Sequence, residues 1–520
     1  MRISCKSITI CFFLMPSFLS AQTEKVDTSM MRRIREEGLL HSQVGPIAEQ
    51  LTDIAGSRLT NSPGFKRAGD WAVSTLKQWG LENAKMEAWG EFGYGWSVEK
   101  SYVSMRLPYY EPLIGYANPW SGSTPGMVTA PVLLLQKSDS AFLEKNASSI
   151  RGKIVLFKYQ DTIMGSPFVA DARRYSDSDL LKLGDTYMLT SQMLNFFMPK
   201  ILAFKKARKM LKEKGAMAVL DLDESGRDGT VFVEGFGGYK KEDPPALPEL
   251  VLSKEAYLKI ERLALTGINL TLELEIQTKL YKDDTKGYNL VADIPGVDPG
   301  LKDEVVMLGG HLDSWQTATG ATDNGAGCIV MLEAVRILHV LGVQPKRTIR
   351  IALWSGEEQG LLGSFNYVKN HFGDPTTMQL KPEQQKVSAY FNLDNGTGKI
   401  RGIYDQGNKA VIPVFSKWLE SFYDLGASTV TPHSTGATDH LSFDAVGIPG
   451  FQFIQDPLEY ETRTHHSNMD SYDHLMLADL RQAATIVAAF IYNTAMRPEK
   501  LPRKQLPKPE KFLFEEFLKF

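Results

Sequence analysis

The spacing of hydrophobic positions divides the chain into regions with different expected structures. From residue 28 to about 90, apolar side chains recur every three or four positions, which predicts helices punctuated at Gly56 and Gly80. The next segment, "SVEKSYVSMRLPYY", has a pattern typical of a strand. Residues 121–282 combine short strands, such as "APVLLLQ" and "GKIVLFKYQ", with a basic amphipathic helix that stops at Gly215 and a later strand–helix unit. We expect this middle segment to form an inserted β-rich domain.

From Tyr288 onward, continuous apolar runs alternate with helical patterns. The expected strands are "NLVADIPG", "EVVMLGGHLD", "RTIRIALWS" and "VSAYFNLDN", and the helices include "AGCIVMLEAVRILHVLG" and "GLLGSFNYVKNH". Strands that are apolar throughout, separated by helices, are typical of a parallel sheet that is buried on both faces. We therefore predict an α/β fold with a mainly parallel sheet covered by helices on both faces. A last helix, "LADLRQAATIVAAFIYNTAM", ends before Pro498.

The N-terminal segment has the pattern of an export signal. A basic start is followed by a short apolar run and by "LSA" ahead of Gln22, which suits removal of residues 1–21 by a signal peptidase. A membrane anchor is the alternative, but the run is short and is broken by Pro16. Removal leaves Cys328 as the only one of three cysteines, so the mature chain forms no internal disulfide. We expect a secreted or periplasmic protein in which Cys328 is a buried structural thiol.

Length and charge narrow the function classes. A chain of 520 residues is expected to form two or three domains. Its 43% hydrophobic and 23% charged residues are typical of a globular protein. The formal charge is −3, and it becomes −5 without the two cations of residues 1–21. Because this balance provides no basic field, we expect no nucleic-acid partner. The short N-terminal run, broken by Pro16, leads us to expect no stable membrane insertion.

Candidate chemistry is concentrated in the α/β part of the chain. Eight of the nine histidines lie between His311 and His474, and residues 121–282 contain none. In parallel sheets, ligands bind beyond the carboxyl ends of the strands. Three acidic groups follow predicted strands there, in "HLD", "GEE" and "LDN". Each group alone is a weak signal, but their convergence on one sheet edge predicts a metal site.

The spacing of these residues has a physical rationale. His311 and Asp313 are two positions apart, so in extended backbone they lie on the same side. His311 can bind a metal while Asp313 orients a ligand or accepts the imidazole N–H. Asp323 lies in a Gly- and Ala-rich turn that opens the next helix, where its carboxylate can reach inward. The alternative for Asp323 is a helix N-cap.

The run "SGEEQG" meets the needs of metal-assisted hydrolysis. One of Glu357 and Glu358 can coordinate a metal while the other takes a proton from a bound water; a solvated acidic loop is the alternative. Asp394 and His466 supply further ligands, so that the set suffices for two metal ions if Asp323 bridges them. Imidazole and carboxylate ligands suit zinc, with cobalt or manganese as substitutes. No HExxH motif occurs, which excludes the single-zinc plan built on that helix.

Five motifs resemble one peptidase family: "GGHLDSW", "TDNGAG", "PKRTIRIALWSGEEQGLLGS", "NLDNG" and "HHSNMDS". They look like the co-catalytic zinc exopeptidases, which include bacterial leucyl aminopeptidases and glutamate carboxypeptidase, and are closest to the carboxypeptidase Q branch. The resemblance runs from "LTDIAGSRLTNSPG" to the last helix, and the middle segment resembles a protease-associated insert. It implies two zinc ions held by five residues: His311 and Asp394 on one ion, Glu358 and His466 on the other, and Asp323 as the bridge.

The resemblance also assigns roles around the metals. Glu357 matches the general base, and Asp313 matches the acidic residue that orients His311. The Asp323–Asn324 peptide is often cis in this family. Many family aminopeptidases carry a Tyr near the last His ligand; here the residue is His465, which is either an oxyanion donor or a packing residue.

The "TGATDHLSF" loop resembles the substrate-side loop of the family. Asp439 and His440 therefore either line the pocket or serve the structure. Short peptides with free ends are the expected substrates. The insert either caps the cleft or forms a dimer contact, so a homodimer is also an expectation.

The resemblance divides the chain into five segments. They are a signal peptide (1–21), the first part of a peptidase domain (22–120), an inserted protease-associated-like domain (121–282), the second part of the peptidase domain with the metal site (283–498), and a C-terminal tail (499–520). Two other functions stay open. A non-catalytic receptor-like relative would hold no stoichiometric zinc, and a single-zinc glutaminyl cyclase would form pyroglutamate from Gln-peptides.

Overall fold

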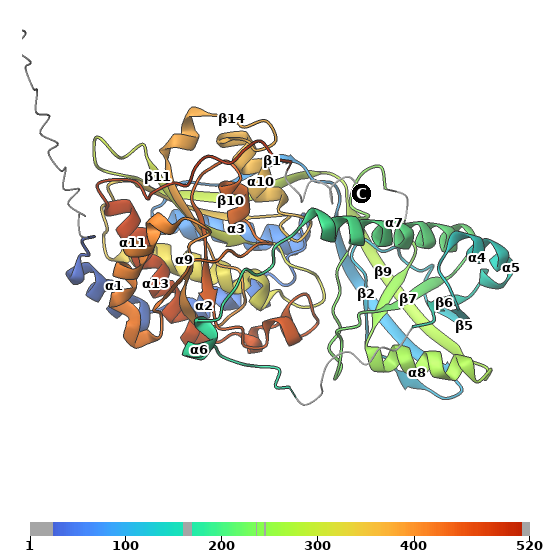
Figure 1. Ribbon diagram of the computed structural model, residues 1–520. Coiled ribbons are helices and arrows are strands. Elements are labelled where there is room, and N and C mark those ends of the chain that lie inside the picture. The colour runs from blue at the N-terminus through green and yellow to red at the C-terminus, as the bar shows by residue number, and fades with distance from the viewer. Residues whose placement is uncertain (1–23, 160–168, 236, 244–245, 512–520) are drawn as a thin grey trace, which may run out of the picture.

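Two lobes, each built on an eight-stranded mixed sheet, make up the molecule in this computed structural model (Figure 1). The structure describes residues 24–159, 169–235, 237–243 and 246–511. The expected signal peptide (1–21) and the end of the tail (512–520) lie outside the described residues. No helix within the described part is long and apolar enough to cross a membrane.

The sheet of the first lobe carries the predicted α/β strands. Its order is β1(Glu82–Glu91), β10(Lys286–Ile294), β12(Thr348–Trp354), β11(Val305–His311), β15(Val387–Asn392), β18(Gly450–Gln455), β16(Ile400–Tyr404) and β17(Thr429–Thr431). The four strands from β12 to β18 in this order run parallel, as does the pair β16–β17, whereas β1, β10 and β16 join antiparallel neighbours. The sheet is therefore mixed with a parallel centre.

Helices cover both faces of this sheet, as predicted. Leu308 and Phe391 face a core shared with most of the helices, whereas Met307 and Tyr390, the preceding residues, face a second core on the other side. This alternation follows from the period of two along a strand. The first face is covered by α1(Thr28–Leu40), α2(Val44–Glu49), α3(Pro63–Gln78), α9(Ala326–Val340), α11(Ile412–Leu419) and α13(Leu477–Met496), and the second by α10(Leu362–His371) and α12(His440–Asp444).

The segment before residue 90 is not helical throughout, which corrects one expectation. Its end forms β1, which pairs antiparallel with β10 at the edge of the first sheet. Ala84 packs in the core of the first lobe and Trp89 in the core of the second. Hydrogen bonds to β10 are available only in the folded chain, so pairing at the sheet edge overrides the local spacing of apolar residues.

The sheet of the second lobe begins before the predicted insert. Its order is β3(Glu111–Pro112), β2(Gly95–Leu107), β9(Thr271–Tyr281), β5(Val128–Leu135), β6(Ile154–Phe157), β7(Ala218–Leu222), β8(Glu249–Leu252) and β4(Gly115–Ala117). Residues 95–117, which we placed in the first part of the peptidase domain, therefore belong to this second sheet. The reason is the long antiparallel pairing of β2 with β9, which starts at Gly95 and Tyr281.

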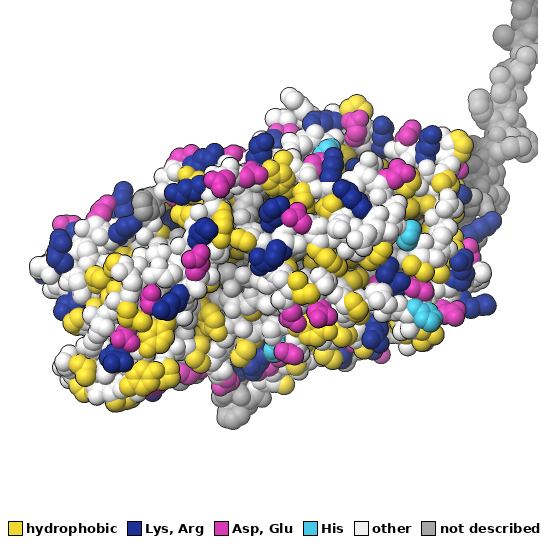
Figure 2. Space-filling model, turned by 180° about the vertical axis from the view of Figure 1, so that it is seen from behind, with side chains coloured by type: hydrophobic (Ala, Val, Ile, Leu, Met, Phe, Trp, Pro, Cys, Tyr) yellow, Lys and Arg dark blue, Asp and Glu magenta, His cyan; other side chains and the backbone are white. Residues whose placement is uncertain are grey.

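Helices also flank the second sheet on opposite sides. α7(Ser191–Glu213) packs through Ala207 and Leu211 on one core, and α8(Lys254–Leu265) packs through Tyr257 and Ile260 on the other. In Figure 1, α7 runs along the upper side of this lobe and reaches toward the first lobe. Acidic and basic side chains are interspersed over the rear of the molecule (Figure 2), in keeping with the near-balanced charge.

Short elements complete the described fold. They are α4(Ser140–Lys145), α5(Ala147–Ile150), α6(Asp177–Leu180), β13(Gly373–Asp374), β14(Gln379–Leu380), η1(Gln50–Ile54), η2(Ala321–Gly325), η3(Pro382–Lys386), η4(Lys409–Val411), η5(Glu420–Leu425), η6(Tyr460–Thr464) and η7(Tyr472–His474). Cys328 is buried and unpaired near the start of α9, as expected.

Candidate metal centre

His311 ends β11 at the carboxyl edge of the parallel strands. Gly309 and Gly310 precede it because the neighbouring strands approach closely: a Cβ on Gly309 would lie 2.0 Å from the carbonyl oxygen of Ala352. The imidazole is 1% exposed, and its Nδ1 lies 3.0 Å from the backbone oxygen of Asp313. Its Nε2 therefore points away from the strand and is available to a ligand.

Asp313 serves the next loop as well as His311. The closer contact to the His311 Nδ1 is the backbone oxygen, while the carboxylate Oδ1 lies at 3.6 Å. The carboxylate accepts a hydrogen bond from the Thr60 hydroxyl at 2.9 Å and faces the backbone N–H groups of Glu357 and Glu358, each at 3.4 Å. Asp313 thus links the β11 end to the loop after β12.

Asp323 lies in the turn that joins β11 to α9. Its side chain caps no helix, which removes the N-cap alternative, and the Asp323–Asn324 peptide is cis. Asp470 accepts hydrogen bonds from the backbone N–H groups of Thr322 at 2.6 Å and Asp323 at 3.1 Å. Because Asp470 binds the backbone of this turn, the Asp323 carboxylate points to the other side, toward His311 and His466.

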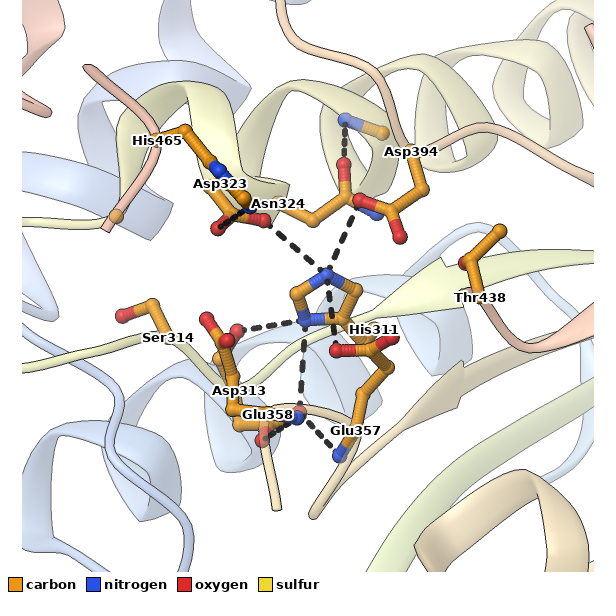
Figure 3. Close-up of polar contacts among 12 residues, drawn as sticks. His311, Asp313, Ser314, Asp323, Asn324, Glu357, Glu358, Asp394, Thr438 and His465 are labelled. Carbon is orange, nitrogen blue, oxygen red and sulfur yellow. Dashed lines mark hydrogen bonds and ion pairs between the residues drawn. The ribbon is translucent and has the colours of Figure 1, made fainter. Parts of the chain in front are cut away.

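The five predicted ligands converge. Asp323 Oδ1 lies 3.3 Å from His311 Nε2, and its Oδ2 lies 3.1 Å from His466 Nε2. Asp394 Oδ1 lies 3.2 Å from His311 Nε2, and Glu358 Oε2 lies 3.0 Å from His466 Nε2. Figure 3 shows the His311 ring among the carboxylates that approach it from different strands and loops. The structure thus brings all five side chains into one cluster.

The two adjacent glutamates differ in their partners. Glu358 faces His466, whereas Glu357 Oε2 lies 3.8 Å from His311 Nε2 and makes no closer contact there. Burial raises the pKa of Glu357 well above its ordinary value and that of Glu358 to about 8. Both carboxyl groups are therefore driven toward the protonated form unless a positive charge lies nearby.

The donor set fits a divalent metal. Burial also acts on Asp323, but hydrogen bonds from His311 and His466 hold the pKa of this carboxyl well below its usual range. One oxygen of Glu358 (Oε1) is buried without a hydrogen-bond partner. Buried carboxylates and imidazoles in this arrangement exchange protons for a cation when a metal binds.

The three tentative substrate residues are placed differently. His465 lines the cavity beside the cluster, and its ring contacts that of His466 in a tilted arrangement, with 3.7 Å between centroids. Asp439 and His440 are fully buried and do not line that cavity, where Thr438 lies instead. Of the two alternatives for Asp439 and His440, their burial agrees with a structural role and not with lining this cavity: α12 begins at His440, so its first turn packs inside the lobe.

Three residues of the site are not marked as functional by the sequence. The buried Arg58 guanidinium donates to four backbone carbonyls, among them Leu312 and Gly320 on the loops that carry His311 and Asp323. Asp470 holds the Asp323 turn, and Glu234 of the second lobe contacts His466. Arg58 and Asp470 lie inside quoted motifs, but no local signal marks Glu234.

A cavity of about 310 Å³ opens beside the cluster. Its wall combines the candidate ligands with residues of the second lobe, including Met198, Ile201 and Lys205 on α7. Among the described residues that line it, Lys205 is the only Lys or Arg. Pockets that bind small ligands combine apolar walls with a few polar groups in this way.

Comparisons with known proteins agree with the geometry. Residues 289–491 match the profile of peptidase family M28. Carboxypeptidase Q of Pongo abelii is 28% identical over 454 residues, covering 87% of this chain and 85% of the relative.

Among solved structures, the peptidase M28 precursor of Shewanella amazonensis has a TM-score of 0.66 and 24% identity, covering 92% of this chain and 98% of that one. A zinc aminopeptidase of Bacillus subtilis has a TM-score of 0.53 and 20% identity, covering 88% of this chain and 96% of that one. These structures support the fold. The family profile over residues 289–491 and the carboxypeptidase Q relatives lead to one conclusion: the chain is a metallo-exopeptidase similar to peptidase family M28.

Proposed function

We propose that the protein is a zinc-dependent exopeptidase of short peptides that holds two zinc ions. His311 and Asp394 would bind one ion, Glu358 and His466 the other, and Asp323 would bridge them. The observation that carries this proposal is the position of Asp323, whose two oxygens face two different imidazoles at 3.3 and 3.1 Å. Similarity to a zinc aminopeptidase of Bacillus subtilis supports zinc as the metal.

The side chains around the ligands supply the remaining chemistry. When bound, zinc would polarise the scissile carbonyl and lower the pKa of a water molecule. Glu357 accepts the proton of that water at its carboxylate and returns it to the leaving amine. Asp313 keeps the Glu357 loop in place through the backbone N–H at 3.4 Å. His465 donates to the oxyanion from the cavity wall.

We further propose that the substrates are short peptides, dipeptides above all, with a free carboxyl end. The cavity of about 310 Å³ suits a ligand of this size. Lys205 on α7 places a positive charge on the cavity wall. A terminal carboxylate that binds there would exchange its bound water for a charge-assisted hydrogen bond to this side chain. The similarity to carboxypeptidase Q supports attack on peptides of this kind.

Two measurements on the purified protein test this proposal. Metal analysis should find two zinc ions per chain, and removal of zinc by a chelator should abolish hydrolysis until zinc is returned. In a panel of free, amino-blocked and carboxyl-blocked dipeptides, those with a free carboxyl end should be cleaved much faster than the carboxyl-blocked ones. A protein without stoichiometric zinc, or one that forms pyroglutamate from Gln-peptides and leaves dipeptides intact, contradicts the proposal.

Export and assembly are separate proposals. We propose that residues 1–21 direct export and that the mature chain begins at Gln22, which mass spectrometry of the protein from cell fractions tests directly. We also propose a homodimer, which light scattering after gel filtration tests. A mature chain that keeps its first residues, or a monomer at micromolar concentration, refutes the respective proposal.

A further inference from the structure

One contact joins the second lobe to the candidate metal centre. Glu234 follows β7 in the chain and lies 232 residues before His466. Its Oε1 lies 2.6 Å from the Nδ1 of His466, while the Nε2 of the same ring faces Asp323 and Glu358 at 3.1 and 3.0 Å. The imidazole is therefore held between a carboxylate of the second lobe and two carboxylates of the first.

Backbone pairing supports this contact on both sides of His466. The N–H of Val233 donates to the His466 carbonyl at 2.8 Å, and the N–H of Asn468 donates to the Val231 carbonyl at 3.1 Å. Between them, residues 232 and 467 form an antiparallel bridge. The side chain of Asn468 also accepts from the N–H of Val231 at 2.7 Å. Residues 231–234 thus lie along residues 466–468 around one isolated bridge.

The local conformation of His466 explains the need for such support. Its φ is +59°, in the left-handed region that non-glycine residues rarely adopt. Conformations of this kind persist where the surroundings over-determine them. The hydrogen bond from Val233 fixes the carbonyl of this residue, and Glu234 fixes its ring.

The two candidate imidazoles are oriented by different means. His311 contacts the backbone oxygen of Asp313 two residues away, so its own loop sets the ring. The Nδ1 of His466 meets a carboxylate from a distant part of the chain. Such a partner on the second nitrogen fixes the tautomer and raises the basicity of a metal ligand.

We propose that Glu234 is a positioning residue for the metal centre. It accepts the Nδ1 proton of His466 and thereby presents Nε2 to zinc, so that the second lobe completes the site. Zinc affinity is then tied to the pairing of residues 231–234 with residues 466–468. The inference rests on the proposed zinc site, but it does not depend on which peptide is cleaved.

The test measures zinc affinity of the full-length protein without any substrate. Competition with a chromophoric chelator gives the dissociation constants, and the melting temperature of the zinc-free protein reports on folding. Glu234→Ala should weaken zinc binding roughly 10- to 100-fold, the usual cost of losing such a partner. Glu234→Gln keeps an oxygen that accepts the Nδ1 proton, so it should recover most of this loss. Neither change should move the melting temperature of the zinc-free protein by more than a few degrees.

A matched control removes the same kind of contact elsewhere. Glu87 lies 2.6 Å from His371 Nε2, between β1 and α10, so Glu87→Ala breaks an equally short carboxylate–imidazole contact away from the ligands. This variant should bind zinc as the unaltered protein does.

Three outcomes overturn the inference: Glu234→Ala with unchanged zinc affinity, Glu234→Gln as weak as Glu234→Ala, or an equal loss in Glu87→Ala. Unaltered protein that binds no zinc overturns the proposed function as well. Unaltered protein that binds zinc but cleaves no peptide overturns the proposed function alone.

Discussion

Replacing Glu357 by Gln separates catalysis from metal binding. The change keeps the shape of the side chain and removes its ability to accept a proton. Glu357 Oε2 lies 3.8 Å from His311 Nε2, farther than the nearest oxygens of Asp394 and Asp323 at 3.2 and 3.3 Å. The expected ligands therefore stay in place in Glu357→Gln, and zinc content should not change.

The expected loss of rate follows from the position and charge of Glu357. Burial raises the pKa of its carboxyl well above the ordinary value, opposed by His311 and reinforced by Asp394, which makes it a stronger base once ionised. A positioned general base contributes roughly 10²- to 10⁴-fold to a rate. At about 1.4 kcal/mol for each factor of ten, this is about 3–5 kcal/mol of transition-state stabilisation. We expect kcat to fall by this factor while KM changes little.

The assay measures kcat and KM on a free dipeptide together with zinc content by elemental analysis. Glu358→Gln is the matched control, because Glu358 Oε2 lies 3.0 Å from His466 Nε2 and its neutralisation should cost zinc as well as activity. A Glu357→Gln protein with kcat within tenfold of the unaltered enzyme refutes the assignment of the base. So does a Glu357→Gln protein that loses zinc as Glu358→Gln does.

Three further predictions concern specificity and stability. Lys205→Met should raise KM for free dipeptides roughly 10- to 100-fold, which is the value of a hydrogen bond to a charged group. KM for carboxyl-amidated peptides should not change. Equal increases in KM for both kinds of peptide in steady-state kinetics contradict a role of Lys205 in binding the terminal carboxylate. Arg58→Met removes four hydrogen bonds to carbonyls, three of them buried. Urea unfolding should therefore show a loss of roughly 3–5 kcal/mol, because buried acceptors lose their donor, and a loss below 1 kcal/mol refutes the reasoning. A hydrogen bond from His371 lowers the pKa of Glu87 to about 2. Because this folded-state pKa is depressed, the stabilisation is present above the unfolded value near 4.5 and is lost as pH falls through about 2. At neutral pH, the free energy of unfolding of Glu87→Gln should therefore be lower than that of the unaltered protein by less than ~1 kcal/mol, because the pair is partly exposed. A stability difference that grows as the pH falls contradicts the expected direction of this pH dependence.

The parallel strands that carry the candidate metal ligands could be predicted from the sequence. Apolar strands separated by helices predicted the parallel centre, and the carboxyl ends of such strands meet at one edge whatever chain connects them. His311 ends one strand of that edge and Glu358 and Asp394 follow two others, and each of these carboxylates shares a possible metal-binding group with His311. These residues converge because each is attached to an element whose direction is set by local pattern.

Other features could not be read in this way. Residues 82–91 become a strand only because β10 offers an edge, and residues 95–117 join the second sheet only because β9 returns to pair with β2. Asp439 and His440 lie in a family-like loop, yet the start of α12 turns them into the interior. In the first two cases the pairing strand lies more than a hundred residues away, and in the third the position depends on packing. The local spacing of apolar residues carries no information about either.

The order of residue types along the chain determined the chemistry: imidazoles and carboxylates at strand ends, in numbers that suit metal-assisted hydrolysis. Tertiary structure alone decided which oxygen of Asp323 meets which ring, and that the second lobe supplies Glu234 to His466. The physical reason is the distance along the chain over which each influence acts. Backbone periodicity acts over a few residues, whereas the orientation of a side chain in a buried cluster depends on every surface that closes around it.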